Sequence, residues 1–302
     1  MSSTPSQAPV GASAPSFTGL SRDRAVRNQV ATVLVWACFA LALVPLVWIL
    51  WTVLSNGWSL LFDAGWWTHS QRNILPDKAG GGAYHAIVGT VLQALVCAVI
   101  AVPLAVFTAI YLVEYGRGRL AKLVSFMVDI LTGIPSIVAA LFVYALWVTA
   151  FGLERVGFAV SLSLVLLMIP VVVRSTEEML KLVPNELREA SYALGVPKWK
   201  TIARIVLPTA IGGIVTGIML GLARVMGETA PLLILGPYAN AINTDLFSGF
   251  QAALPTMIRD LFDQPEAPAV ERMWASALTL ILLVLLLNVA GRVVARFSGV
   301  KK

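Results

Sequence analysis

Six stretches of this 302-residue chain are each apolar enough and long enough to cross a lipid bilayer as a helix. A crossing needs about 20 mostly apolar residues, because a helix rises about 1.5 Å per residue and the hydrocarbon core is about 30 Å thick. Charged residues make up only 13% of the chain, against about 25% in soluble domains, so a soluble globule is excluded. We therefore predict an all-α polytopic membrane protein with six transmembrane helices, near Val30–Leu54, Tyr84–Val113, Ile130–Phe151, Gly157–Val173, Ile205–Leu235 and Met273–Val289.

The N-terminal residues differ in composition from the rest. Residues 1–20 are rich in Ser, Pro, Ala, Thr and Gly, and they contain neither a charge nor a long apolar run. This composition predicts disorder; a signal peptide would instead have a basic start and an apolar stretch. We expect a disordered cytoplasmic tail over residues 1–28 and a six-span domain over residues 29–298, with a cytoplasmic loop over residues 175–208.

The basic residues predict the orientation of the spans. With the N-terminus inside, 16 of the 22 lysines and arginines fall in inner segments and five in outer segments, as the positive-inside rule requires. Both termini are therefore expected in the cytoplasm, and the net charge of +6 reflects topology rather than nucleic-acid binding. Seven tryptophans lie near the outer boundaries, where indole rings favour the headgroup region: Trp48, Trp51, Trp58, Trp66, Trp67, Trp147 and Trp274.

Residue types that carry out bond chemistry are sparse. His69 and His85 fit no metal-ligand spacing, and Cys38 and Cys97 lie in apolar runs, as small buried residues do. The sequence contains no phosphate-binding loop of the form Gly-x-x-x-x-Gly-Lys-[Ser/Thr]. We therefore expect no catalytic residue, no metal site and no ATP site in this chain.

The inner loop over residues 175–208 has the pattern of two helices joined by a turn. Pro184 can stop the incoming helix and Asn185 is a suitable N-cap. Gly195 suits a helix C-terminus, and Pro197 can start a second short helix. Such an element can dock into a groove on another protein, or it can simply join two spans in water; the pattern alone leaves both interpretations open.

The fifth apolar stretch contains Arg224 and Glu228, four residues apart. A charge in hydrocarbon costs at least about 2.5 kcal/mol, so both side chains must face protein or a water-filled cavity. They can neutralise each other as an ion pair, or the guanidinium can line an anion pathway, because its fork donates two hydrogen bonds to an oxyanion. Gly227 and Pro231 would let the helix bend beside them.

The third stretch is interrupted by Gly133 and Pro135, which predict an irregular turn at membrane depth. Such a turn is tolerated only where protein or a cavity covers it. Thr132 and Ser136 lie on either side of the turn. Their hydroxyls can cap the freed backbone or contact an anion, and both interpretations stay open.

The inner loop resembles the Glu-Ala-Ala motif of binding-protein-dependent ABC importer permeases. Three residues separate Glu189-Ala190-Ser191 from Gly195, and nine residues separate Gly195 from Ile205-Val206-Leu207-Pro208. The one departure is Ser191 in place of the second alanine. The resemblance implies the type I, MetI-like permease fold, and it implies that Glu189, Ala190, Ser191 and Gly195 belong to a coupling helix that sits on a separate ATPase subunit.

Two further runs resemble the phosphate-importer permeases of PstA type, namely 223–232 around Gly227-Glu228-Thr229-Ala230-Pro231 and 129–138 around Gly133-Ile134-Pro135. The resemblance implies a phosphate permease of the bacterial inner membrane, with a PstC-type permease, a PstB-type ATPase dimer that binds ATP and Mg²⁺, and a PstS-type phosphate-binding protein as partners. Another oxyanion importer, for sulfate, molybdate or tungstate, and an ion-coupled secondary carrier are the alternatives. The expected substrate-pathway residues are Arg224, Glu228, Thr229, Thr132 and Ser136.

Overall fold

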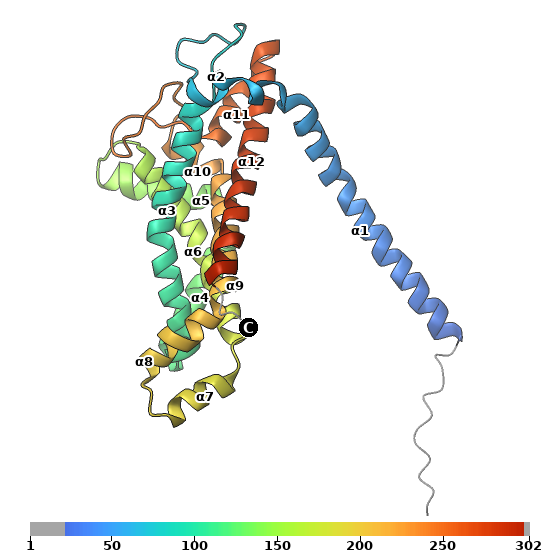
Figure 1. Ribbon diagram of the computed structural model, residues 1–302. Coiled ribbons are helices and arrows are strands. Elements are labelled where there is room, and N and C mark those ends of the chain that lie inside the picture. The colour runs from blue at the N-terminus through green and yellow to red at the C-terminus, as the bar shows by residue number, and fades with distance from the viewer. Residues whose placement is uncertain (1–21, 299–302) are drawn as a thin grey trace, which may run out of the picture. The chain divides into compact units, whose positions relative to one another are not determined.

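A computed structural model describes residues 22–298, and every regular element in that range is a helix (Figure 1). Within these described residues, five helices are long and apolar enough to cross a membrane, and a bent pair of helices supplies a sixth candidate span. The five are Arg22–Gly57 (α1), Tyr84–Ile110 (α3) continued by the π-helical turn Tyr111–Tyr115 (η2), Gly157–Lys181 (α6), the run Lys198–Met226, and Ala267–Ser298 (α12). The predicted all-α architecture is confirmed.

The chain divides after Thr52 into two units. The described part of the first unit is the helix α1, which contains Pro45 and continues to Gly57 in the second unit. Because α1 begins at Arg22, residues 22–28 are helical and the predicted boundary of the disordered tail is wrong; residues 1–21 lie outside the described part of the chain. Asp23 in the first turn favours this early start, since an acidic side chain is stabilised by the helix dipole there.

The core of the second unit is formed by α3, α6, α9 (Leu207–Met226) and α12, with α6 packed on both α3 and α9, and α9 packed on α12 (Figure 1). Small residues bring the backbones close, as is usual between helices in membranes. On α3, a stripe at four-residue spacing is fully buried and consists of Cys97, Ala101, Ala105 and Ala109. On α9, Gly217 and Gly221 face Ser175 and Val172 of α6.

The third predicted span, Ile130–Phe151, is not one straight helix. Gly118–Gly133 (α4) and Ser136–Tyr144 (α5, continued by the π-helical turn η3 to Ala150) meet at 105°. Ile134 is extended (φ −71°, ψ 126°) and Pro135 is the N-cap of α5. The residue before a proline disfavours the helical conformation, so the chain breaks at the turn that the sequence predicts, but α4 begins twelve residues before the predicted span.

The boundaries of the fourth and fifth spans also differ from the prediction. α6 runs on to Lys181, and the fifth span begins at Lys198 (α8, Lys198–Thr201), passes through the π-helical segment Ile202–Val206 (η4) and ends with α9 at Met226. The π-helical segment comes just before Pro208, whose missing N–H and ring disturb a regular helix. The predicted span Ile205–Leu235 is therefore interrupted by three residues, and α10 (Ala230–Leu235) is a separate short helix.

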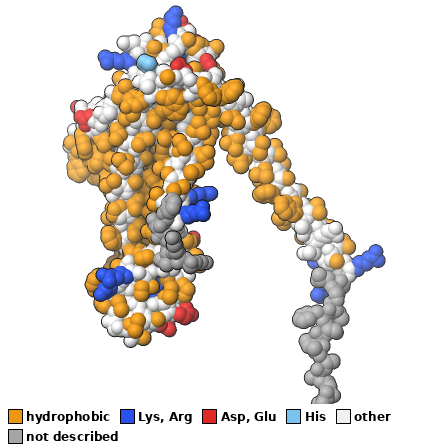
Figure 2. Space-filling view, viewed as in Figure 1, with side chains coloured by type: hydrophobic (Ala, Val, Ile, Leu, Met, Phe, Trp, Pro, Cys, Tyr) orange, Lys and Arg blue, Asp and Glu red, His pale blue; other side chains and the backbone are white. Residues whose placement is uncertain are grey.

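Short helices close the end of the second unit opposite the helix α7 (Asn185–Ala193). They are Ser59–Phe62 (η1), Ala64–Thr68 (α2) and Leu254–Phe262 (α11). The indole N–H of Trp66 donates to Thr279 Oγ1 at 2.9 Å, and Trp66 is fully buried beside Met257. In the visible face of this unit, hydrophobic side chains cover the middle and charged side chains gather toward the two ends (Figure 2). This is the distribution expected of a membrane-spanning bundle.

Candidate functional sites

The first candidate site is the hairpin of α7 and α8. As predicted, a helix, a turn at Gly195 and a second helix follow each other, and Gly195 has a left-handed backbone (φ +75°) that favours glycine. The cap of α7 is Pro184 rather than Asn185. The second helix is not a short element, because α8 continues without a break into the spanning helix α9. The hairpin is therefore continuous with a candidate membrane span.

The four predicted coupling residues do not all face outward. Glu189, Ala190 and Gly195 are exposed, whereas Ser191 is buried and its hydroxyl lies 2.8 Å from Thr201 Oγ1. Ser191 thus joins α7 to α8 instead of offering a surface to a partner. Leu194, which is not among the four predicted coupling residues, is 83% exposed beside the turn. Trp199 in α8 is exposed as well, so the hairpin presents two large apolar side chains to its surroundings. The signal in the sequence is an apolar side chain in a polar loop.

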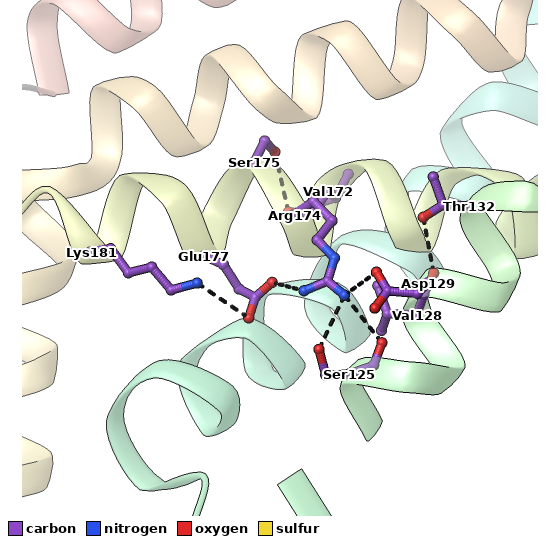
Figure 3. A network of polar contacts seen from close by, with 9 residues as sticks. All are labelled: Ser125, Val128, Asp129, Thr132, Val172, Arg174, Ser175, Glu177 and Lys181. Carbon is purple, nitrogen blue, oxygen red and sulfur yellow. Dashed lines mark hydrogen bonds and ion pairs between the residues drawn. The ribbon is translucent and has the colours of Figure 1, made fainter. Parts of the chain in front are cut away.

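The second candidate site is a polar cluster around Arg174 that joins α4 to α6 (Figure 3). Its guanidinium contacts Asp129, and it donates to Glu177 Oε2 at 2.5 Å and to the carbonyl and hydroxyl oxygens of Ser125, both at 3.1 Å. Glu177 is buried and Asp129 is largely exposed. The cluster holds α4 against α6 just before the break at Pro135. In the sequence, Arg174 counts only as one of the basic residues that indicate the orientation of the spans.

The break itself carries Thr132 and Ser136. Thr132 Oγ1 donates to the carbonyl oxygen of Val128 at 2.9 Å, so it satisfies its own helix in this structure. Ser136 is half-buried at the start of α5. Within residues 22–298, no recorded hydrogen bond or ion pair joins either side chain to Arg224, Glu228 or Thr229. The structure therefore does not bring the predicted pathway residues into one contact network.

Arg224 and Glu228 do meet. Arg224 lies in the last turn of α9, and its Nε is 3.5 Å from Glu228 Oε1 across the break that follows Met226. The Arg224 side chain is 51% exposed and that of Glu228 is 17% exposed. Thr229 is half-buried and forms the N-cap of α10, which packs against α5. A half-exposed guanidinium beside two interrupted helices is a polar feature in an otherwise apolar stretch, where it must face protein or water.

A further polar cluster, around Arg272, lies at the end opposite α7, and the sequence pattern does not indicate it. The buried Arg272 donates to the carbonyl oxygens of Lys78 at 2.8 Å and Pro76 at 3.0 Å, and so holds the loop after α2. Near it, burial raises the pKa of Asp260, the charge of Asp263 raises it further and Arg259 opposes the shift. This cluster stabilises the loops at that end. Among the described residues, no group of three or more His, Cys, Asp or Glu side chains is placed to hold a metal ion.

The chain matches the family model of the binding-protein-dependent transport system inner membrane component over residues 101–298. The phosphate transport system permease protein PstA 1 of Mycobacterium tuberculosis (strain ATCC 25618 / H37Rv) is 54% identical over 286 residues, which are 95% of this chain and 92% of that protein. The chain therefore belongs to the binding-protein-dependent transport system inner membrane components, and within them to the PstA permeases.

Solved structures agree on the fold. A bacterial alginate ABC transporter, in complex with an alginate-bound periplasmic protein, contains a chain that matches with a TM-score of 0.63 and 16% identity, covering 91% of this chain and 97% of that one. The MetNI methionine ABC transporter, in an inward-facing conformation, matches with a TM-score of 0.56 and 21% identity, covering 72% and 95%. Together with the family, the fold defines a permease subunit and a multi-pass inner membrane protein of MetI-like architecture.

Proposed function

We propose that this chain is the permease subunit of an ATP-driven phosphate importer and forms half of its translocation path. The observation that carries the proposal is the 54% identity to a phosphate transport system permease over nearly the whole of both chains. The chemistry of the break after α9 supports it, because a half-exposed arginine at the end of an apolar span suits an oxyanion.

The Arg224 guanidinium provides five N–H donors, and its Nε lies 3.5 Å from Glu228 Oε1. The two terminal nitrogens can then donate to two oxygens of one phosphate. Glu228 fixes the rotamer of Arg224 and accepts a hydrogen bond from a protonated phosphate oxygen. Thr229, Thr132 and Ser136 add hydroxyl groups near the two helix breaks, and a change in the α4–α5 bend would turn Thr132 from its own backbone toward the path.

The proposed assembly pairs this chain with a PstC-type permease, a dimer of PstB-type ATPases and a PstS-type phosphate-binding protein. ATP and Mg²⁺ belong to the ATPase subunits, and this chain contributes no catalytic residue. Both termini and the α7–α8 hairpin face the cytoplasm, where Glu189, Ala190, Gly195 and the exposed Leu194 meet the ATPase. Closure of the ATPase dimer moves the hairpin and, through α8, the spanning helix α9 that carries Arg224.

The test is phosphate uptake by the complete transporter with Arg224→Gln, which removes the charge of the guanidinium but keeps a polar side chain at this position. We expect uptake to fall by at least about tenfold, since a charge-assisted contact is worth about 1.5–3 kcal/mol. Co-purification of the ATPase verifies assembly, and Arg72→Gln, in an exposed loop, is the matched control. Normal phosphate uptake by an assembled Arg224→Gln transporter rejects the role of Arg224, and faster uptake of sulfate than phosphate by the unaltered transporter rejects the substrate.

A further inference from the structure

A buried ion pair ties the hairpin to a distant span. Arg188, on the inner side of α7, donates from Nη2 and Nε to Glu114 Oε1 at 2.9 and 3.1 Å. The side chains of Arg188 and Glu114 are only 12% and 5% exposed. Glu114 belongs to η2, the π-helical turn that ends α3, and lies 74 residues away in the chain. Buried charges of this kind are kept only when their partners are well placed.

The same guanidinium also holds the end of α6. It donates from Nη1 to the carbonyl oxygen of Val183 at 2.6 Å and from Nη2 to that of Leu180 at 2.9 Å. Carbonyl groups at a helix C-terminus have no partner within their own helix, so Arg188 supplies one. A single side chain of α7 is thus bonded both to the end of α3 and to the end of α6, the two helices that pack together in the core.

The second helix of the hairpin is fastened at the same place. Lys198, at the start of α8, contacts the carbonyl oxygen of Glu114, and its ammonium group lies 4.7 Å from the centre of the Tyr115 ring. Ser191 and Thr201 join α7 to α8. With both helices bonded to η2 and to each other, α7 cannot be displaced alone without breaking buried polar contacts.

We propose that Glu114 and Arg188 are positioning residues that convert a displacement of α7 into a displacement of α3. This inference rests on the proposed function, in which an ATPase moves α7. The connections from α6 into α7 and from α8 into α9 are covalent, whereas α3 is reached through the polar contacts at η2, among which this ion pair is the buried one. Without it, the ATPase still docks on the exposed face of α7 and still hydrolyses ATP, but only part of the helix bundle follows.

The experiment measures the ratio of anion transported to ATP hydrolysed by the complete transporter in proteoliposomes. We expect Glu114→Gln and Arg188→Gln each to lower this ratio at least about fivefold, the lower range of coupling between sites, while ATP hydrolysis and co-purification of the ATPase persist. Because the two residues act through each other, the double variant loses no more than the worse single variant. Arg259→Gln, which breaks the exposed pair with Asp263 on α11, leaves the ratio unchanged.

Two results overturn the proposal: an unchanged ratio in assembled Glu114→Gln transporters, or a loss of hydrolysis in parallel with transport. If Arg188→Gln prevents assembly, Glu114→Gln decides, because it keeps the contacts of Arg188 with Leu180 and Val183. A cysteine substituted at Ala190 and cross-linked to the ATPase shows that docking is intact in each variant. The ratio is taken with whichever anion the unaltered transporter carries, so an error in the proposed substrate leaves this test valid.

Discussion

The contact between α6 and α9 depends on Gly217, and replacing this residue with alanine tests how tightly the two helices are packed. A Cβ atom at position 217 would lie 2.1 Å from Ser175 Oγ and 2.6 Å from Ser175 Cβ. The hydroxyl can rotate away, but Cβ cannot, and its distance is about 0.8 Å short of the 3.4 Å at which ordinary contact begins. The helices must therefore separate, and overpacking of this kind costs about 1–3 kcal/mol.

Gly212→Ala is the matched control in the same helix. A Cβ at position 212 meets no atom within 4 Å, so this variant gains only the better helix propensity of alanine, about 1 kcal/mol. Gly217→Ala gains the same propensity, and the difference between the two variants isolates the packing cost.

Thermal unfolding of the purified protein in detergent measures this difference. We expect the Tm of Gly217→Ala to lie clearly below that of Gly212→Ala, with phosphate transport reduced in the same order. Equal Tm values for the two variants would show that α6 and α9 are not in close contact at Ser175, and the reasoning about the core would be wrong.

The polar network and the hairpin surface lead to two more expectations. Glu177→Gln removes the charge of the buried partner of Arg174 and destabilises the protein by about 3 kcal/mol. Asp129→Asn, on the exposed side of the same arginine, costs about 1 kcal/mol or less. Thermal unfolding of both variants checks this order, and a larger loss of stability for Asp129→Asn would contradict the assignment of Glu177 as the buried partner. Leu194→Glu places a charge at an exposed apolar position beside the turn. Co-purification of the ATPase should fall, while the free energy of unfolding stays within about 0.5 kcal/mol of that of the unaltered protein, as for exposed positions in general. Retained ATPase would exclude Leu194 from the docking surface.

Local chemistry in the sequence predicts much of this architecture. The break at Ile134-Pro135 follows from the restricted backbone of proline and of the residue before it. The left-handed turn at Gly195 follows from the freedom of glycine at positive φ. Both lie where the sequence indicates. The ends of the helices are less predictable. α4 begins at Gly118 and α6 continues to Lys181, because polar residues at a membrane boundary are as compatible with a continuing helix as with a loop.

The motif that indicates the hairpin also misleads in one respect. Ser191 is one of the signature residues, yet it faces Thr201 inside the hairpin, while Leu194, at a position that the motif leaves unspecified, is exposed. Which side of a short helix faces a partner depends on how the helix is docked to its own chain. Here Arg188 determines it by binding Glu114.

The sequence alone determined that this chain is a multi-span helical membrane protein with a helical hairpin between its fourth and fifth apolar stretches. These features depend on local properties: hydrophobicity, the placement of proline and glycine, and the asymmetry of basic residues. Only the tertiary structure decided which charges meet: Glu114 with Arg188, and Asp129 with Arg174. These partners are 74 and 45 residues apart. No helical or turn periodicity extends over such separations, so their pairing follows from the packing of α3 and α4 beside α6.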